Sequence, residues 1–562
     1  MFLIKNSMFT LILNGFYSNL IQFFFWTTDI SQFYYNYFFT FLNYKPTIII
    51  SSNTSEVFMF LWLLILLLFS SVYYKVYSNT HSFSAQEFVE NLFRLVISII
   101  FITIIFLIIS ITFKKPYDFF FTVEFWELFL QSDLEKVKLF INLLSAILLF
   151  FFTEKSNLNS NWKKNPLFYS ASLFEYPLFY LFSVFLCDVL LSSNHLFLTF
   201  LSIVGLSLCL YSLIAFDKNI YSIEAAAKYF SIGALASGLM LFGIFSFYQT
   251  SQTLFLTDLN IVFLSFENSL SLNILDYNLY LGLISFLFGF LFKLSAFPCH
   301  MWAPDVYDGS SMLITSFLMT VIKTAIFFYL IFFLLKALFF FKFIWGPFLI
   351  LSGIGSIFVG TFGAFYQNRL KRFFAFTSMG QIGLSLISFG LFFTTSVFSL
   401  SFAILNFIIY IFTTFVFFCI FFTGLHLLNK PINSLNNTRF AINELSDFHL
   451  NIAFLLTINI LSMAGIPPLI GFLTKFLILN LVFSFSPILL IILLLFHLVN
   501  TFNYLRLVQL IWFKKVIKFS IFNLTFSYLK SKNLVILDIF SWINLILILK
   551  IDLLINYFFV NF

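Results

Sequence analysis

The chain has 562 residues, of which 61% are hydrophobic and only 9% are charged, and its mean hydropathy is +1.02. Soluble domains usually carry about 25% charged residues, so this composition excludes a mainly soluble protein and indicates a polytopic membrane protein. The basic residues behind the net charge of +7 lie in short loops between apolar runs. They bear on membrane topology, and we expect no nucleic-acid partner.

We expect neither a metal site nor a cofactor-binding site within this chain. Its four cysteines are far apart, and no C-x-x-C motif or Cys/His cluster joins them. They are Cys187, Cys209, Cys299 and Cys419. Four glycines lie inside one apolar span, where small residues favour close helix packing rather than a nucleotide-binding loop. These are Gly353, Gly355, Gly360 and Gly363.

Phenylalanine is unusually frequent, at 93 residues. Nothing about membrane insertion demands Phe over Leu, so we interpret the excess as codon bias in an AT-rich genome, such as that of an organelle. The N-terminus, MFLIKNSMFTLILNGFYSNL, lacks the Arg-rich amphipathic pattern of a mitochondrial transit peptide. We therefore expect an organelle-encoded, multi-pass protein of the mitochondrial inner membrane; a bacterial origin is the alternative.

The fold class expected is an all-α polytopic membrane protein with about fourteen core transmembrane helices, each needing about 20 mostly apolar residues. Residues 1–54 form an N-terminal extension with room for one extra span. The core spans are expected at 55–75, 92–113, 137–153, 168–190, 195–216, 225–248, 279–298, 312–335, 344–366, 373–393, 399–425, 452–480, 485–502 and 541–560. The basic segment 503–540 is expected to lie along the membrane surface.

Loop charges test this topology. From residue 154 on, one set of alternating loops holds fifteen lysines and arginines, whereas the opposite set holds only Lys336, Lys342 and Lys550. Positive loops face the cytoplasm or matrix, so the first set marks the inner side. Upstream the rule works poorly, because Lys114 and Lys115 fall in the wrong set.

Two spans are interrupted by proline. The seventh ends in KLSAFP at Pro298, and the twelfth contains Pro467 and Pro468 about halfway along. Paired broken helices in corresponding halves indicate inverted repeats around an ion path, here spans 4–8 and 9–13. Backbone groups freed at a break must be satisfied by protein or water, so a break marks a hydrated interior.

These features divide the chain into five parts. They are the extension (1–54), three N-terminal transmembrane helices (55–153), a first repeat (154–335), a second repeat (336–502), and the surface segment with the C-terminal transmembrane helix (503–562).

Lysines are the candidates for chemistry. Lys293, Lys323 and Lys475 lie deep in apolar spans, and Lys228 follows Glu224 at the start of the sixth span. A lysine near mid-membrane costs roughly 2.5–3.5 kcal/mol on insertion scales, so it is interpreted as functional. Because desolvation disfavours the ammonium form, such lysines can titrate near neutral pH, and a row of them can carry protons.

Each lysine also has a structural alternative. Lys293, Lys323 and Lys475 could extend their side chains to a membrane interface. Lys228 could form only an i,i+4 ion pair with Glu224.

The polar segment after Pro298 adds further candidates. His300 is a candidate proton relay, with a merely solvated histidine as the alternative. Asp305 and Asp308 are interpreted as turn and helix-cap residues. The cluster Arg369, Lys371 and Arg372 is interpreted as a positive-inside anchor.

At these motifs the sequence resembles the antiporter-like membrane subunits of proton-pumping NADH:quinone oxidoreductase, respiratory complex I. Among them it most resembles those called NADH dehydrogenase (ubiquinone) subunit 2. The matching stretches are IEAAAKYFSIGALASGLMLFG (223–243), FKLSAFPCHMWAPDVYDG (292–309), TVIKTAIF (320–327), NRLKRFFAFTSMGQIG (368–383) and LSMAGIPPLIGFLTKF (461–476). The PDVYDG segment is specific, because related antiporter-like subunits typically show a PDAH-type sequence there.

The resemblance implies roles for the lysines and makes both repeats antiporter-like. Lys293 would be the central proton-carrying lysine, Lys323 the link to the second half-channel and Lys475 the terminal lysine. Lys228 and His300 match the family's sixth-span lysine and the histidine after its proline.

The resemblance also implies cofactors and partners. NADH, FMN, iron–sulfur clusters and ubiquinone would belong to partner subunits, with none in this chain. The implied partners are other membrane-arm subunits of complex I, including neighbouring antiporter-like subunits, together with membrane lipids.

One departure from the family pattern concerns its fifth-span glutamate, which pairs with the central lysine and lies three residues before an S-L-P-L-Y segment. Here that segment begins at Ser207, and the glutamate position is Val204. Either Glu175 or Asp188 in the preceding span substitutes in space, or the first half-channel works differently or is silent.

The expected function is proton translocation along the buried lysines, coupled to quinone reduction elsewhere in the complex. Two alternatives stay open. The chain could be a structural membrane-arm subunit with a silenced proton channel, for which Val204 is the motivation. It could also be a stand-alone cation/proton antiporter, which the PDVYDG segment disfavours.

Overall fold

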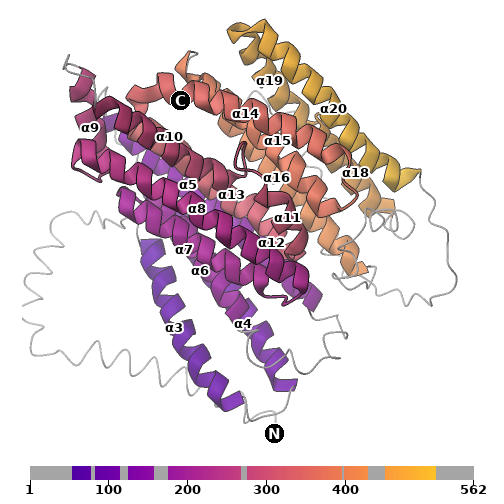
Figure 1. Ribbon diagram of the computed structural model, residues 1–562. Coiled ribbons are helices and arrows are strands. Elements are labelled where there is room, and N and C mark those ends of the chain that lie inside the picture. The colour runs from indigo at the N-terminus through magenta and orange to yellow at the C-terminus, as the bar shows by residue number, and fades with distance from the viewer. Residues whose placement is uncertain are drawn as a thin grey trace, which may run out of the picture. The chain divides into compact units, whose positions relative to one another are not determined.

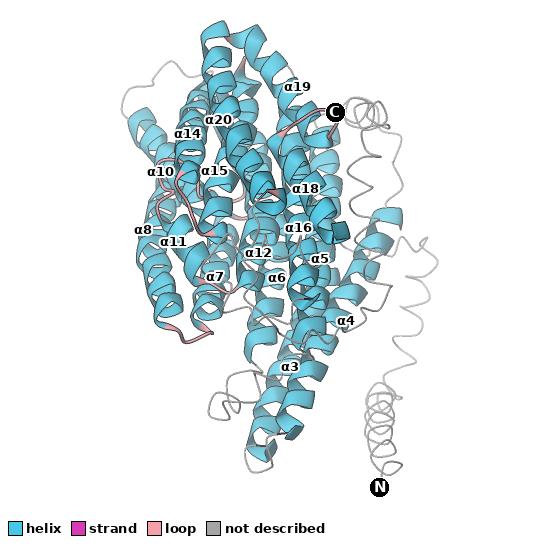
Figure 2. Cartoon of the chain, turned by 90° about the vertical axis from the view of Figure 1, so that its right-hand side faces the viewer, coloured by secondary structure: helices cyan, strands magenta, loops and turns pink. Residues whose placement is uncertain are grey.

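The computed structural model describes residues 54–77, 83–113, 124–156, 175–267, 275–394, 398–427 and 450–513. These residues fold into helices joined by turns, with one isolated β-bridge between His195 and Phe255 (Figures 1 and 2). The all-α prediction is therefore confirmed for this part of the chain. The N-terminal extension before α3 and the last expected span, 541–560, lie outside the described residues.

The helices follow the apolar runs of the sequence. Three come first: α3 (Thr54–Tyr77), α4 (Phe83–Phe113) and α5 (Glu124–Ser156). The next group is α6 (Glu175–Ser192), α7 (Leu196–Ala215), α8 (Ile220–Ser251), α9 (Leu256–Glu267), α10 (Leu275–Leu294), α11 (Trp302–Gly309), α12 (Met312–Phe317), η3 (Leu318–Ile322) and α13 (Lys323–Lys336). The last group is η4 (Phe339–Phe341), α14 (Lys342–Phe365), α15 (Leu370–Gly390), η5 (Leu391–Phe393), α16 (Phe398–Leu427), α18 (Leu450–Ala464), α19 (Ile470–Phe485) and α20 (Pro487–Trp512).

Every expected span between 55 and 502 overlaps a described helix. Within the described ranges, eight helical segments are long and apolar enough to cross a membrane, and five shorter apolar helices accompany them. The chain is therefore a multi-pass membrane protein. The segment Met312–Lys336 is buried over most of its length, whereas Pro487–Trp512 is largely exposed, so the first lies inside the bundle and the second at its edge.

Both predicted helix breaks are present. The seventh span ends at Leu294, and a turn through Ser295, with φ of 60°, leads to the short helix α11. The twelfth span is divided between α18 and α19 by a turn through Gly465, with φ of 82°. Only glycine adopts such a φ without steric cost, which explains Gly465 before the two prolines.

The structure corrects the expected course of the chain at two places. Helix α20 continues to Trp512, so residues 503–512 extend that helix rather than lying along the surface. One side of this extension packs against α14, where Asn503 donates to the carbonyl oxygen of Thr361 and Arg506 donates to that of Phe365. Helix α9 lies between two expected spans, in a segment for which no transmembrane span was predicted, and at 12 residues it is shorter than a span.

Glycines allow close contact between α14 and α15, which lie side by side (Figure 1). A methyl group added at Gly353 would lie 2.8 Å from the carbonyl oxygen of Gly383, and one at Gly360 would lie 2.7 Å from the nitrogen of Gly380. Gly346 faces Gly390 in the same way. The predicted role of the glycines of this span in close helix packing is confirmed for Gly353 and Gly360.

Candidate functional site

Lys293 lies in the last turn of α10, immediately before the first break. Its side chain is 5% exposed, and its Nζ has no hydrogen-bond partner among the described residues. The nitrogen lies 5.8 Å from the ring centre of Tyr229 and 5.5 Å from that of Phe292. A cation is attracted to such ring faces, but the rings replace only part of its lost hydration.

The freed backbone of this break is satisfied without Lys293. The carbonyl oxygen of Phe292 accepts from the indole Nε1 of Trp302 at 2.9 Å and from the amide of Ser295 at 3.0 Å. The ring of Trp302 also lies on Tyr229, with centroids 4.6 Å apart. The short helix α11 thus closes the end of α10.

An aromatic bridge leads from Lys293 to Lys323. Trp302 contacts Tyr307 edge to face at 6.0 Å, and Nζ of Lys323 lies 5.4 Å from the Tyr307 ring. Lys323 follows the π-helical turn η3 directly, and π-helical turns are frequent at functional sites because they reorient neighbouring side chains. No pattern in the sequence signalled this turn.

Lys323 is 1% exposed and donates to Oγ of Ser378 on α15 at 3.0 Å. The alternative that it extends to the membrane interface is wrong. Ser378 belongs to a set of buried polar residues on α15 that face the interior of an otherwise apolar bundle. The set is Thr377, Ser378, Gln381, Ser385 and Ser388.

Lys475 lies beside the second break and bonds to its freed carbonyls. Its Nζ donates to the carbonyl oxygens of Met463 at 2.7 Å and Ala464 at 2.8 Å, and the side chain is 6% exposed. It therefore does not extend to an interface either. A methyl group at Gly465 would lie 2.7 Å from Cδ of this lysine, so the glycine also makes room for it.

A small cavity of about 20 Å³ lies against Lys475 and reaches α15 at Gln381. Tyr410, Asn406 and Tyr504 also line it. Its volume suffices for about one water molecule, and these polar side chains in a partly apolar lining can provide hydrogen-bond partners. The cavity places hydrogen-bonding groups between Lys475 and the polar set of α15.

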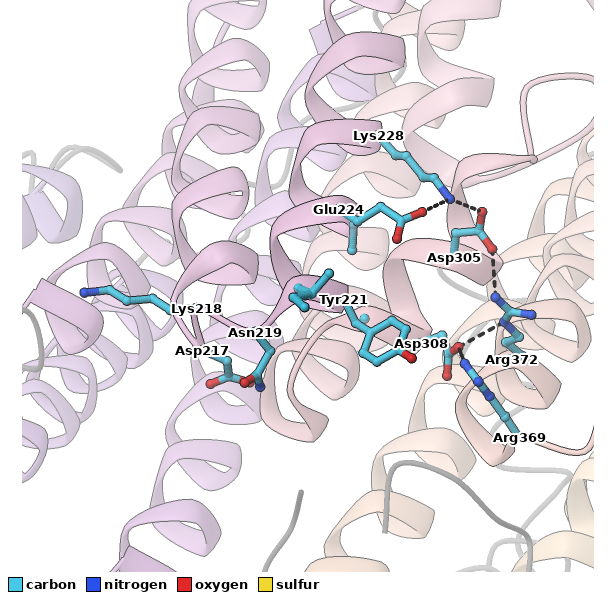
Figure 3. Close-up of a pocket in the computed structure, with 13 residues that line it drawn as sticks. Asp217, Lys218, Asn219, Tyr221, Glu224, Lys228, Asp305, Asp308, Arg369 and Arg372 are labelled. Carbon is cyan, nitrogen blue, oxygen red and sulfur yellow. Dashed lines mark hydrogen bonds and ion pairs between the residues drawn. The ribbon is translucent and has the colours of Figure 1, made fainter. Parts of the chain in front are cut away.

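Lys228 is not buried, unlike the three lysines described above. Its side chain is 43% exposed and pairs with Glu224 at 2.8 Å and with Asp305 at 3.1 Å. These residues line an open pocket of about 790 Å³ between α8, α11 and the start of α15 (Figure 3). Lys218 and Arg369 also line this pocket, so the loop charges assign it to the inner side.

Asp305 and Asp308 belong to helix α11, so their interpretation as turn and cap residues is wrong. Figure 3 shows a continuous row of ion pairs from Lys228 through Asp305 to Arg372 and Asp308. Arg372 reaches Asp305 and Asp308 at 3.1 Å each, and Arg369 pairs with Asp308 as well. These pairs tie α8, α11 and α15 together at the inner end of the bundle.

Lys371 was interpreted with its neighbours as a surface anchor, but the structure buries it to 3% exposure. Its Nζ donates to the carbonyl oxygen of Ser310 at 2.6 Å, beyond the end of α11. The sequence did not reveal the burial of Lys371, because a run of basic residues beside a span is typical of a positive-inside anchor.

His300 lies in the connection between α10 and α11 and is half-buried. Its Nδ1 lies 3.1 Å from the carbonyl oxygen of Pro298, and its ring is parallel to that of Phe297. Partial burial lowers the pKa of this imidazole, and the Pro298 carbonyl opposes that effect. Burial thus favours the neutral imidazole, in which one ring nitrogen donates and the other accepts.

The two candidate substitutes for the missing glutamate lie apart from Lys293. Glu175 is exposed in the first turn of α6. Asp188 is fully buried, but it accepts from Asn142 on α5 at 2.9 Å, and no described contact joins it to Lys293. Val204 on α7 is half-buried. Within the described ranges, no group of three or more His, Cys, Asp or Glu side chains could hold a metal ion.

Comparison with known proteins places this arrangement in a family. The family model described as NADH:quinone oxidoreductase/Mrp antiporter, TM, matches residues 193–501. The chain belongs to this family. It is an antiporter-like membrane subunit of the complex I type.

Curated relatives of this antiporter-like subunit include bacterial proteins named NADH-quinone oxidoreductase subunit N. The one from Pelagibacter ubique is 34% identical over 61% of this chain and 70% of its own length. That from Methylovorus glucosotrophus is 32% identical over 60% of this chain and 68% of its own.

Solved structures agree on the fold. A chain of respiratory complex I from Thermus thermophilus superposes with a TM-score of 0.62 at 21% identity, covering 89% of this chain and 98% of its own. A chain of the Mrp complex from Dietzia sp. superposes with a TM-score of 0.60 at 15% identity, covering 82% of this chain and 81% of its own. The fold is thus shared by complex I and antiporter complexes.

Proposed function

We propose that this subunit translocates protons in the membrane arm of NADH:ubiquinone oxidoreductase, using Lys293, Lys323 and Lys475 as carriers. Quinone reduction in partner subunits changes the charge along the axis, and each lysine alternates between ammonium and amine. Protons enter from the inner side, where the open pocket around Lys228 meets water. The observation that supports the proposal is that these three lysines are buried and that each lies beside an interruption in its helix.

Chemistry supports each step of this path. An amine nitrogen accepts a proton, and the resulting ammonium donates it onward. Ser378, Tyr307 and the polar side chains that line the cavity at Lys475 supply hydrogen-bonding groups for the carriers. Because the carriers are buried, a charge on one changes the proton affinity of the next more strongly than it would in water.

The test uses the two lysines of α13. In the complex reconstituted into vesicles, we expect Lys323→Met to lower the number of protons moved per electron while NADH oxidation continues. The matched control is Lys336→Met, which removes the other buried lysine of the same helix, at its outer end beside Asn194. Equal ratios in Lys323→Met and the unchanged complex would contradict the proposal.

A structural membrane-arm subunit is the second candidate, because Val204 replaces an acid that the resemblance would require. Lys293→Ala separates the two. If the chain is a structural subunit, the complex with this variant keeps the normal proton-to-electron ratio. If the chain pumps protons, the ratio falls. Replacing Val204 with Glu provides the complementary test, since a silenced half-channel would gain transport.

A stand-alone cation/proton antiporter is the third candidate, because the fold is shared with Mrp complexes. Native gels of mildly solubilised membranes, stained for NADH oxidation and probed by mass spectrometry, decide this point. We expect the subunit in a large NADH-oxidising particle. Its recovery only in a small particle without that activity, with transport surviving in the isolated chain, would establish the antiporter instead.

The proposal extends to cofactors, partners and location. We propose that the flavin, iron–sulfur clusters and quinone site lie in partner subunits, and that neighbouring antiporter-like subunits and lipids contact this chain. The abundance of Phe supports an AT-rich organellar genome and the mitochondrial inner membrane, although the curated relatives named above are bacterial. Sequencing DNA from purified mitochondria tests this location.

A further inference from the structure

A second buried cluster of charged residues lies between α3, α5 and α6. It contains none of the three proposed carriers, Lys293, Lys323 and Lys475, which we call the lysine axis. Nζ of Lys138 on α5 lies 2.5 Å from Oε1 of Glu56 on α3, and their side chains are 2% and 12% exposed. One turn along α5, Asn142 donates from Nδ2 to Oδ2 of Asp188 on α6 at 2.9 Å. We name Glu56, Lys138, Asn142 and Asp188 the α5 cluster.

Asp188 has an unused acceptor in this cluster. Its side chain is fully buried, and its Oδ1 has no hydrogen-bond partner among the described residues. The nitrogen of Asn142 is already shared with the carbonyl oxygen of Lys138 at 3.0 Å. A buried carboxylate oxygen without a donor is costly, and protonation removes the charge that makes it so.

The charges of the cluster fit one exchangeable proton. Glu56 and Asp188 each carry −1 when ionised and Lys138 carries +1, so the sum is −1 without a bound proton and zero with one. Lys138 lies close enough to act on Asp188 electrostatically. The lysine moderates the cost of the ionised state, so that Asp188 can both bind and release its proton.

The position of the cluster joins the lysine axis to the outer side. Asp188 lies four residues before the end of α6 at Ser192, roughly 6 Å along the helix, and the loop charges predict that α6 ends outside. Helix α5 packs against η3 and α13, which lead into and carry Lys323. Tyr180 on α6 also contacts Phe317, next to η3, with ring centroids 4.4 Å apart.

The cluster also lies beside the position of the missing acid. A methyl group at Gly205 on α7 would lie 3.2 Å from Leu186 on α6, so Val204 and Asp188 occupy neighbouring turns of packed helices. Asp188 faces α5 instead of α7. The buried acid of this region therefore lies on α6, one helix before the position of Val204 on α7. The lysine of its cluster, Lys138, lies on α5.

We propose that Asp188 is a proton-carrying residue and that the α5 cluster releases protons from the first half of the chain at the outer side. The inference rests on the proposed function. Oδ1 of Asp188 takes one proton from a lysine ammonium group, whose N–H bond breaks as the O–H bond forms, and then passes that proton to outside water as the O–H bond breaks. Other titratable side chains buried nearby are Glu135, Tyr180, Cys187 and Cys209.

The experiment compares the two acids of α6 in the whole reconstituted complex. We expect Asp188→Asn to lower the protons moved per electron and to remove a carboxylic-acid C=O band from infrared difference spectra recorded on reduction. Glu175→Gln, at an exposed site on the same helix, should leave both unchanged. Asp188→Glu should restore transport and shift the band. An unchanged ratio and band in Asp188→Asn would overturn the inference.

Two further measurements keep the test decisive. If Asp188→Asn does not assemble, the double variant Glu56→Gln/Lys138→Met removes both charges of the pair. It should retain a carboxylic-acid band that no longer changes on reduction, with lowered transport; wild-type transport would overturn the inference. If Lys323→Met lowers the number of protons moved per electron and Asp188→Asn does not, the inference about Asp188 fails while the proposed function stands. If neither variant lowers it, the proposed function fails.

Discussion

The two helix breaks place a lysine beside freed backbone in opposite ways. At the second break, the carbonyls of Met463 and Ala464 accept from Lys475. At the first, Trp302 and the turn itself take the carbonyl of Phe292, and Lys293 faces only aromatic rings. A helix end always leaves carbonyls to satisfy. Where another group donates to these carbonyl oxygens, as at the first break, the lysine is left without a hydrogen-bond partner. Where none does, as at the second break, the lysine donates to them.

The largest expected effect comes from exchanging the lysines for methionine. Lys475→Met leaves two buried carbonyls without a donor and should lower the free energy of unfolding by about 1–3 kcal/mol for each. Lys293→Met removes a buried group that no partner holds, so stability should stay the same or rise. Chemical denaturation of the two purified variants checks this. Equal losses would show that the two lysines are anchored alike.

Exchanging the turn residues sharpens the comparison. Gly465→Ala places a side chain at φ of 82° against Cδ of Lys475, and should cost about 1–2 kcal/mol from the left-handed backbone alone. Ser295→Gly relieves the same conformation at the first break and should be neutral or stabilising. Thermal unfolding midpoints of both variants measure the difference. A loss in Ser295→Gly would mean that its hydroxyl matters more than its backbone.

Among the residues that the structure describes, only the first break is followed by an ion-paired helix. Arg372→Ala removes contacts to Asp305 and Asp308, but the arginine and Asp305 side chains are 36% and 40% exposed. We therefore expect a loss of less than about 1 kcal/mol that shrinks further in high salt. Stability measured at low and high ionic strength checks this. A large, salt-independent loss would show that the pocket is more desolvated than its exposure indicates.

The smallest expected effect concerns pH at the first break. His300 has a lowered pKa in the folded chain, so the folded state binds fewer protons there than the unfolded state. Its contribution to stability is present above the unfolded pKa of about 6.5 and is lost as pH falls through the folded pKa. His300→Gln should flatten this acid-side loss. Unfolding curves between neutral and mildly acidic pH measure it.

The sequence predicted the main elements because their signals are local. Apolar length marks a span, proline marks a break, and a lysine in an apolar run marks a buried charge, so Lys293, Lys323 and Lys475 were all found. Buried partners were not predictable, because they depend on which distant helix lies alongside. Lys371 was taken for an anchor, and the Lys138–Glu56 pair joins residues 82 positions apart. No feature of the amino-acid composition predicts the π-helical turn before Lys323.

The glycine contacts between α14 and α15 bear on leakage across the membrane. A methyl group at Gly353 or Gly360 would overlap the backbone of the neighbouring helix. Where no methyl group fits, no water molecule fits, and a continuous file of water cannot form along these contacts. The polar residues of α15 thus lie on a helix whose contact with α14 leaves no room for water at these glycines. Protons or ions can therefore cross the membrane along these helices only where side chains carry them.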